Sequence, residues 1–136
     1  MPPRKKQPIT IIVKPPGAAP TTQQIDPGLA AMQAVVGGPI ELMAGSAVGL
    51  SDAIDIWFNE EGKLEQLSAN LGLTHDGQLW DVIVGTVFFA GHDAKGNATS
   101  LDPVHYDAVH AFIKASEMHD HADKFVRDHF TVRTVP

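Results

Sequence analysis

Cysteine is absent from this chain of 136 residues. The absence excludes disulfide frameworks, thiolate nucleophiles and zinc sites with cysteine ligands. A run long enough to cross a membrane is also missing, because the apolar stretch from Val82 to Ala90 has less than half of the roughly 20 residues that a spanning helix needs. "ITIIV" near the start is too short for the core of an export signal. We therefore expect a protein without a membrane anchor that works in the cytoplasm.

Basic residues are scarce. The chain has ten lysines and arginines and 16 aspartates and glutamates, so its formal net charge is -6. This charge disfavours a general attraction to nucleic acid. The only basic cluster is Arg4, Lys5 and Lys6, within a proline-rich start. We expect residues 1–8 to form a flexible basic tail and residues 9–136 to form a single α+β domain. A small DNA-binding accessory protein that uses this cluster remains an alternative.

The first part of the chain predicts a strand followed by a helix. Ile9–Lys14 is rich in β-branched residues and ends at a Pro-Pro-Gly breaker, which is typical of a strand. Residues 15–24 have the composition of a flexible connection. Asp26 and Pro27 then predict the start of a short helix, with Asp26 as its cap, and Gly37 predicts its end.

The middle of the chain predicts further strands. "PIELM" at 39–43 favours a strand, and 54–64 favours a hairpin that turns at "EEGK". Residues 68–80 are polar and interrupted by glycine, which indicates a loop. The apolar run 82–90 predicts one central strand that is buried on both faces, and "ATSL" at 98–101 returns beside it.

The C-terminal segment predicts one long helix. Asp102 and Pro103 form a second cap signal, and apolar residues follow at intervals of three or four up to His129. The predicted fold class is therefore α+β, with a mixed or antiparallel sheet of about four to six strands, one short helix and the long helix packed on one face.

Histidine is abundant, with seven in the chain, and five fall on the predicted long helix: His105, His110, His119, His121 and His129. No two of these have the i, i+4 spacing of a helical metal pair, although Glu117 with His121 and His119 with Asp123 do. An exposed charged face explains them better than a metal site. A metal-assisted hydrolase that uses these histidines remains an alternative.

Catalytic patterns are otherwise missing. The adjacent pairs His75-Asp76 and His92-Asp93 are better explained by turn formation than by acid–base catalysis. The serines lack the G-x-S-x-G elbow, and no glycine-rich phosphate loop occurs. We predict no catalytic residue, no metal ligand and no cofactor.

Two polar residues in apolar surroundings are candidates for binding. Thr86 interrupts the apolar run, and its hydroxyl needs a partner, either backbone or a ligand. Asn70 in "LSANLGL" either turns the backbone or contacts a ligand. Trp57 and Trp80 belong to the core or to the rim of a pocket.

The segments "IIVKP", "IDPGLAAMQAVVGGPIEL", "IWFNEEGKLEQLSAN" and "DVIVGTVFFAGHDAKGNATSL" occur in this order. Because of these four segments, the chain resembles a family of bacteriophage and plasmid proteins known as domain of unknown function 3846. The pattern includes Asn59, Glu60, Asn70 and Thr86, and we take these four as candidate binding residues.

The resemblance implies a phage or mobile-element origin and work in the cytoplasm of a bacterial host. We therefore predict a non-enzymatic binding protein that engages a host protein or a small-molecule ligand, with counter-defence as one such role. A homodimer through the long helix is a further alternative.

Overall fold

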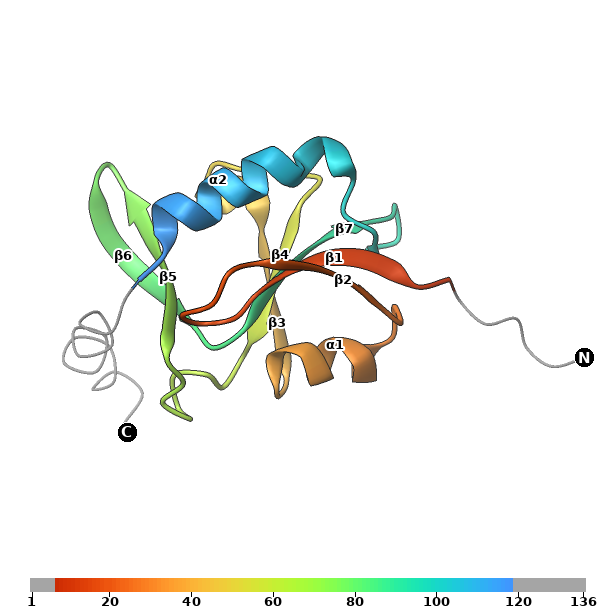
Figure 1. Cartoon of the computed structure of the whole chain (residues 1–136), viewed down its shortest axis with the longest axis horizontal. Coiled ribbons are helices and arrows are strands. Elements are labelled where there is room, and N and C mark those ends of the chain that lie inside the picture. Colours follow the sequence, from red (N-terminus) through yellow and green to blue (C-terminus); the bar gives the residue numbers. More distant parts are fainter. Residues whose placement is uncertain (1–6, 119–136) are drawn as a thin grey trace, which may run out of the picture.

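The computed structural model describes residues 7–118. Figure 1 shows a twisted sheet with one helix on each side: α1 (Leu29–Val36) covers one face and α2 (Tyr106–Ser116) covers the other. A separate two-stranded hairpin lies beside α2 at one end of the sheet. The predicted α+β class, with a short helix and a C-terminal helix, is confirmed.

The main sheet has six strands, and all of its pairs are antiparallel. Five of them follow the order β2-β1-β7-β4-β3, and β8 pairs with the end of β7. Their bounds are β1 Ile9–Lys14, β2 Thr21–Ile25, β3 Ile40–Ala44, β4 Asp55–Asn59, β7 Val87–His92 and β8 Ala98–Thr99.

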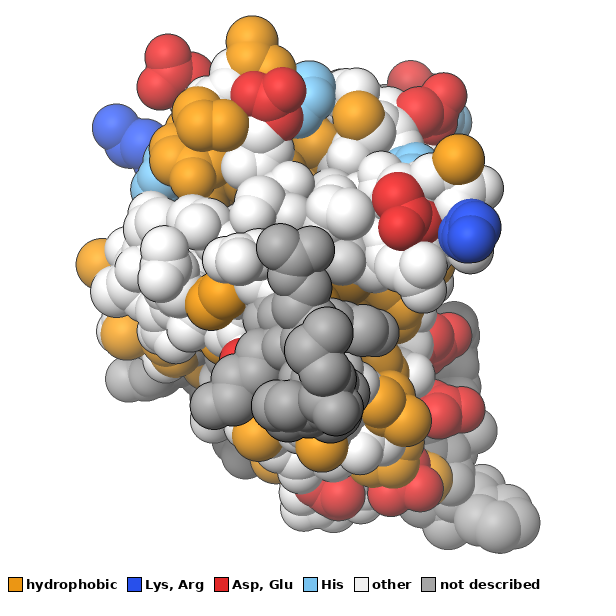
Figure 2. Space-filling view, turned by 90° about the vertical axis from the view of Figure 1, so that its right-hand side faces the viewer, with side chains coloured by type: hydrophobic (Ala, Val, Ile, Leu, Met, Phe, Trp, Pro, Cys, Tyr) orange, Lys and Arg blue, Asp and Glu red, His pale blue; other side chains and the backbone are white. Residues whose placement is uncertain are grey.

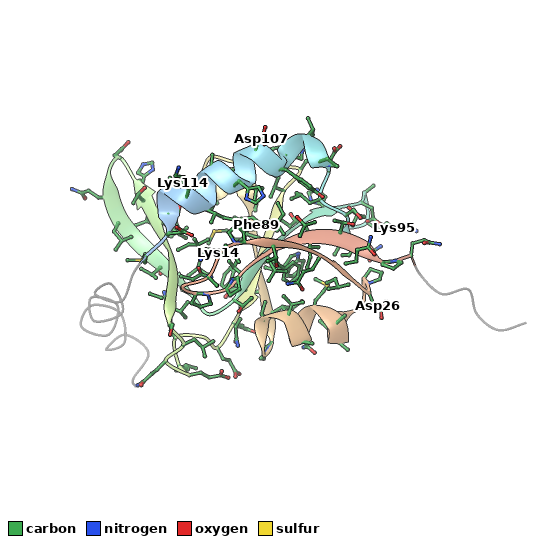
Figure 3. All side chains as sticks on the ribbon, in the orientation of Figure 1. Lys14, Asp26, Phe89, Lys95, Asp107 and Lys114 are labelled. Carbon is green, nitrogen blue, oxygen red and sulfur yellow. The ribbon has the colours of Figure 1, made fainter. Side chains whose placement is uncertain are left out.

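Strand β7 is the centre of this sheet. It pairs with β1 on one side and β4 on the other, and its residues Val87 to Ala90 are fully buried. Phe88 points to the α1 side, in a cluster with Met32 and Val36. Phe89 points to the opposite side, between the sheet and α2 (Figure 3). Its ring meets that of Phe112 edge to face. The double-sided burial predicted for this part of the run is confirmed.

The apolar run 82–90 is two strands rather than one. Gly85 interrupts it with a φ of 76°, so Val84 ends β6 (Gln78–Val84) and β7 begins at Val87. Thr86 therefore lies in the connection and not inside a strand. The chain leaves the small hairpin at this point and enters the middle of the main sheet.

The predicted loop at 68–80 is wrong. This segment supplies β5 (Ala69–His75) and much of β6, which pair as an antiparallel hairpin. Asp76 and Gly77 both have positive φ, the conformation that a tight two-residue hairpin turn requires. Five successive residues of β5 are buried, because one edge and face of the hairpin lie against α2 and the sheet.

Three further boundaries differ from the prediction. Strand β4 pairs with β3 and β7, so the predicted hairpin around "EEGK" is wrong. Residues 21–25 form the exposed edge strand β2 instead of a flexible connection. Helix α1 begins at Leu29 with Gly28 as its N-cap, so Asp26 is not the cap, whereas Gly37 ends the helix as expected.

The C-terminal helix is shorter than predicted. Asp102 accepts a hydrogen bond from the backbone N–H of Val104, as the cap signal predicted, and a short 3-10 turn leads into α2. The helix ends at Ser116, and Glu117 is already extended and bridges to Leu71 of β5. The rest of the predicted helix, with His119, His121 and His129, lies outside the described residues, as does the predicted basic cluster at Arg4 to Lys6. None of the described helices is both long and apolar enough to cross a membrane.

Replacing Gly85 tests the break between β6 and β7. A Cβ at this position would lie 2.7 Å from Leu67 Cδ1, whereas Gly77 has a similar φ of 78° and open space around it. We expect Gly77→Ala to lower the free energy of unfolding by about 1–2 kcal/mol through its φ alone. Gly85→Ala should cost about 0.5–1.5 kcal/mol more, because the end of the Leu67 side chain must leave its rotamer to admit the Cβ. Urea unfolding of both variants measures the difference, and equal losses would show that close packing at Gly85 is unimportant.

Candidate functional site

A cleft opens between the edge of the main sheet and the small hairpin. We call it the β3–β6 cleft; its volume is about 440 Å³. It is lined by Glu41 and Met43 of β3, Phe58 and Asn59 of β4, Glu60, Lys63 and Leu64 of the following loop, and Asp81, Val82, Ile83 and Val84 of β6. Its floor is apolar and its rim is mostly charged.

The loop after β4 gives the cleft its shape. Asn59 is buried; its Oδ1 accepts a hydrogen bond from the N–H of Glu61, and its Nδ2 donates to the carbonyl of Val36 at the end of α1. Gly62 lies so close to β6 that a Cβ there would be 2.8 Å from Val84 Cγ2. The loop is therefore held against both the sheet and the hairpin, and it presents Lys63 and Leu64 to the cleft.

The charges of the cleft do not balance. Lys63 donates to the carboxylate of Asp81, and both side chains are about one-third exposed. Asp81 also accepts a hydrogen bond from the N–H of Val82 at 2.8 Å. Glu41 and Glu60 add two more carboxylates, so the lining has a formal charge of -2. Leu64 at the rim remains 63% exposed. The cleft thus combines an apolar floor with an excess of negative charge.

The lining consists of three carboxylates, one lysine, one asparagine and apolar side chains. It contains no serine, threonine, tyrosine, histidine or cysteine among its described residues. Such a lining offers hydrogen-bond acceptors and apolar contacts. A ligand that carries a positive charge on an apolar stem complements both properties.

The four predicted binding residues do not lie together. Asn59 and Glu60 line the β3–β6 cleft. Asn70 is buried elsewhere, and Thr86 is half-buried in the β6–β7 connection; neither lines the cleft. Trp57 stacks on Phe88 on the α1 side of the sheet.

Three charged residues of the cleft, Glu41, Lys63 and Asp81, were not among the four candidates, although all three lie within the segments that carry the family resemblance. They come from β3, from the loop after β4 and from β6, and they meet because β3 pairs with β4 while β4 contacts β6. Spacing along the chain therefore held no signal for this group.

Asn70 belongs to a buried polar junction around Lys14. Lys14 is only 2% exposed, and Figure 3 shows it inside the molecule near the C-terminal end of α2. Its ammonium donates to the carbonyl of Pro15 at 2.7 Å and to Asn70 Oδ1 at 3.1 Å, and it lies 3.7 Å from Glu117 Oε1. Asn70 Nδ2 in turn donates to the carbonyls of Lys14 and Gly85, both at 2.8 Å. This junction ties β1, β5 and the end of α2 together.

The histidines of the loops have different partners. His92 Nδ1 lies 3.0 Å from Oδ1 of the buried Asp55, on the neighbouring strand β4. Asp93 instead accepts hydrogen bonds from the backbone N–H and the side-chain amide of Asn97 and from the backbone N–H of Lys95, and these bonds lower the pKa of its carboxyl. The turn predicted at "HDAKGN" is therefore present, but His92 is paired across the sheet. His75 lies 3.4 Å from Asp76 on an exposed hairpin tip.

Residues 7–118 contain no group of three or more histidine, aspartate or glutamate side chains placed to hold a metal ion. The helix histidines beyond Met118, which the metal-hydrolase alternative requires, fall outside the described residues. That alternative therefore stays a prediction, and so does the DNA-binding alternative that uses Arg4, Lys5 and Lys6.

A comparison with protein families identifies the chain. The family model described as Domain of unknown function (DUF3846) matches residues 9–113. The chain belongs to this family. The suspected resemblance is confirmed, and the match includes every residue of the β3–β6 cleft. No curated protein and no solved structure shows significant similarity to the chain.

Replacing Asn70 by alanine should destabilise the fold strongly. The variant leaves the carbonyls of Lys14 and Gly85 without their side-chain donor, and it removes one acceptor from the buried ammonium. We expect the free energy of unfolding to fall by about 2–4 kcal/mol. The exposed Asn97 donates to the exposed Asp93, so Asn97→Ala is a matched control that should change stability by no more than about 0.5 kcal/mol. Similar losses in the two variants would contradict the role of the junction.

The pKa of Lys14 provides a test by pH. Burial lowers this pKa below its ordinary value of 10.5, although Glu117 opposes the shift. Between the lowered pKa and 10.5 the unfolded chain binds more protons than the folded protein, so the contribution of Lys14 to stability rises with pH in this window. Urea unfolding from neutral pH up to 10.5 should show this rise in the parent relative to Lys14→Met. A constant difference between the two proteins would contradict the lowered pKa.

Proposed function

We propose that this protein is a non-enzymatic binding protein of phage or mobile-element origin, and that it engages its partner through the β3–β6 cleft in the cytoplasm of a bacterial host. The partner contributes a positively charged group on an apolar stem. The observation that supports the proposal is the lining of the cleft, in which three carboxylates and one ammonium surround an apolar floor. Counter-defence, which the family resemblance suggested, remains a prediction about the identity of this partner.

The charge of the whole protein supports the same class of partner. Its formal net charge is -6, and acidic side chains outnumber basic ones on the face that Figure 2 shows. A cationic partner is attracted over a distance by this field, and the attraction weakens as salt screens it. Within the cleft, Glu41 and Glu60 are the acidic residues without an ion-pair partner among the described residues.

Hexylammonium is the simplest probe of this proposal, because it joins one positive charge to an apolar chain. Titration of the full-length protein, followed by amide NMR, should give saturable shifts at Glu41, Met43 and Leu64. Hexanoate, which has a similar chain and the opposite charge, should give none. Equal binding of the two probes would overturn the proposed specificity.

Glu41→Gln should weaken hexylammonium binding about twofold to fivefold, because it removes one charge at an exposed site while preserving the shape of the side chain. Glu65 lies in the same loop as Lys63, is exposed and does not line the cleft. Glu65→Gln therefore makes the same change of net charge and should leave the affinity almost unchanged. Equal effects of the two substitutions would mean that only the overall charge matters.

A further inference from the structure

Strand β3 forms one edge of the main sheet. It pairs with β4 and has no second neighbouring strand within residues 7–118. The N–H of Glu60 donates to the carbonyl of Pro39, and the N–H of Gly45 donates to the carbonyl of Ile54. These two bonds lie at either end of the β3–β4 pair. They show which residues of β3 exchange hydrogen bonds with β4 and which do not.

The alternation determines which backbone groups are open. In an antiparallel pair, every second residue exchanges hydrogen bonds with its partner. With bonds at Pro39 and Gly45, the bonded residues within β3 are Glu41 and Met43. The N–H and C=O groups of Ile40, Leu42 and Ala44 therefore point away from β4, toward the open edge.

Apolar surface lies on both faces beside this edge. On the cleft side, Met43 of β3 is half-buried, and the exposed Leu64 lines the same cleft. On the α1 side, Leu42 opposite Trp57 is 48% exposed. The other edge of the sheet is different, because β2 consists of exposed threonines and glutamines over most of its length. An added strand could bury apolar side chains at β3 but not at β2.

Glu41 selects the partner by charge. A strand added antiparallel to β3, like every other pair in this sheet, would bond to Ile40, Leu42 and Ala44. Glu41 would then lie in a non-hydrogen-bonded pair, where facing side chains come closest. A lysine or arginine opposite Glu41 would be favoured. A second copy of this chain, paired through its own β3, would bring two acidic clefts together, and this like-charge contact opposes a homodimer at this edge.

We propose that β3 binds an extended segment of a partner polypeptide, which joins the sheet as an added strand and places a lysine or arginine opposite Glu41 in the β3–β6 cleft. This inference rests on the proposed function and specifies how the cationic partner is held. Main-chain hydrogen bonds to the open edge supply affinity, and the acidic, apolar cleft supplies specificity. Apolar residues two positions before and after the basic residue would face the cleft floor.

A capped peptide, acetyl-Thr-Val-Thr-Lys-Thr-Val-Thr-amide, has this pattern. It should bind the full-length protein and slow the hydrogen exchange of the Leu42 amide, which points toward the open edge. The amides of Glu41 and Met43 already bond to β4, so their exchange should change much less. Binding without any protection of Leu42 would contradict strand addition.

N-methylated peptides separate backbone from side-chain recognition. Methylation of the two threonine nitrogens that flank the lysine blocks the donors that face β3, and it should weaken binding roughly tenfold. Methylation of the lysine nitrogen and one valine nitrogen alters donors that point away, and it should weaken binding by no more than about threefold. Equal losses would overturn the proposal.

Leu42→Pro distinguishes this inference from the proposed function. Proline removes an outward N–H that β4 does not use, a change that an edge strand tolerates. The variant should lose peptide affinity roughly tenfold and still bind hexylammonium. If the variant loses both hexylammonium and peptide binding while its thermal unfolding is unchanged, strand addition is not distinct from binding in the cleft, and the inference is wrong. A parent protein that binds hexylammonium but not the peptide, or that forms a dimer through β3 in light scattering, would also overturn it.

Discussion

The burial of β7 on both faces is the constraint on which the rest of the structure depends. Its large side chains alternate between two apolar clusters, with Phe88 on the α1 side and Phe89 on the α2 side. Each of its long edges also pairs with another strand, β1 or β4. Because β7 is buried on both faces, polar substitutions in it are strongly unfavourable. Because it pairs on both edges, it also sets the register of both halves of the sheet. The outer strands β2 and β3 take their positions from it.

The β3–β6 cleft follows from this arrangement. Because β4 must pair with β7, β3 is displaced to the edge of the sheet, and its odd-numbered side chains point to the same face as the hairpin. The sharp turn at Gly85 separates β6 from β7, so the hairpin leans on this face without joining the main sheet. The space that remains between β3 and β6 holds the acidic residues. The cleft thus lies at a place where the main sheet and the hairpin meet but do not merge.

Local signals predicted much of the fold. The strand at Ile9–Lys14, the glycine stop of α1 and the Asp102 cap each depend on neighbouring residues, and each is confirmed. The β5–β6 hairpin was missed because its polar, glycine-containing turn resembled a loop, although Asp76-Gly77 is a strong hairpin signal. The single strand predicted over 82–90 was wrong because continuous apolarity cannot reveal a change of sheet. The prediction of one continuous helix was wrong at Glu117, because apolar spacing does not show that this residue leaves the helix and pairs with β5.

The candidate site was harder to predict. Asn59 and Glu60 were selected through the family pattern, and they do line the cleft, whereas Glu41 and Asp81 come from strands that are distant in sequence. The pairing of His92 with Asp55 has the same origin, since 37 positions separate the two residues and a β-ladder brings them together. Neighbours in sequence, such as His92 and Asp93, were the natural candidates for a pair. Instead, the long-range pairing of β4 with β7 places His92 beside Asp55.

The position of β7 along the chain has a consequence for synthesis. During translation, β1 with β2 and β3 with β4 emerge as separate antiparallel pairs, and the strand that unites them follows only at Val87–His92. Isolated two-stranded pairs have little stability of their own. The junction of Lys14, Asn70 and Glu117 closes later still, when the end of α2 has been made. The nascent chain therefore keeps its future core exposed until β7 has been made, and apolar surface that is exposed in this way is prone to aggregation.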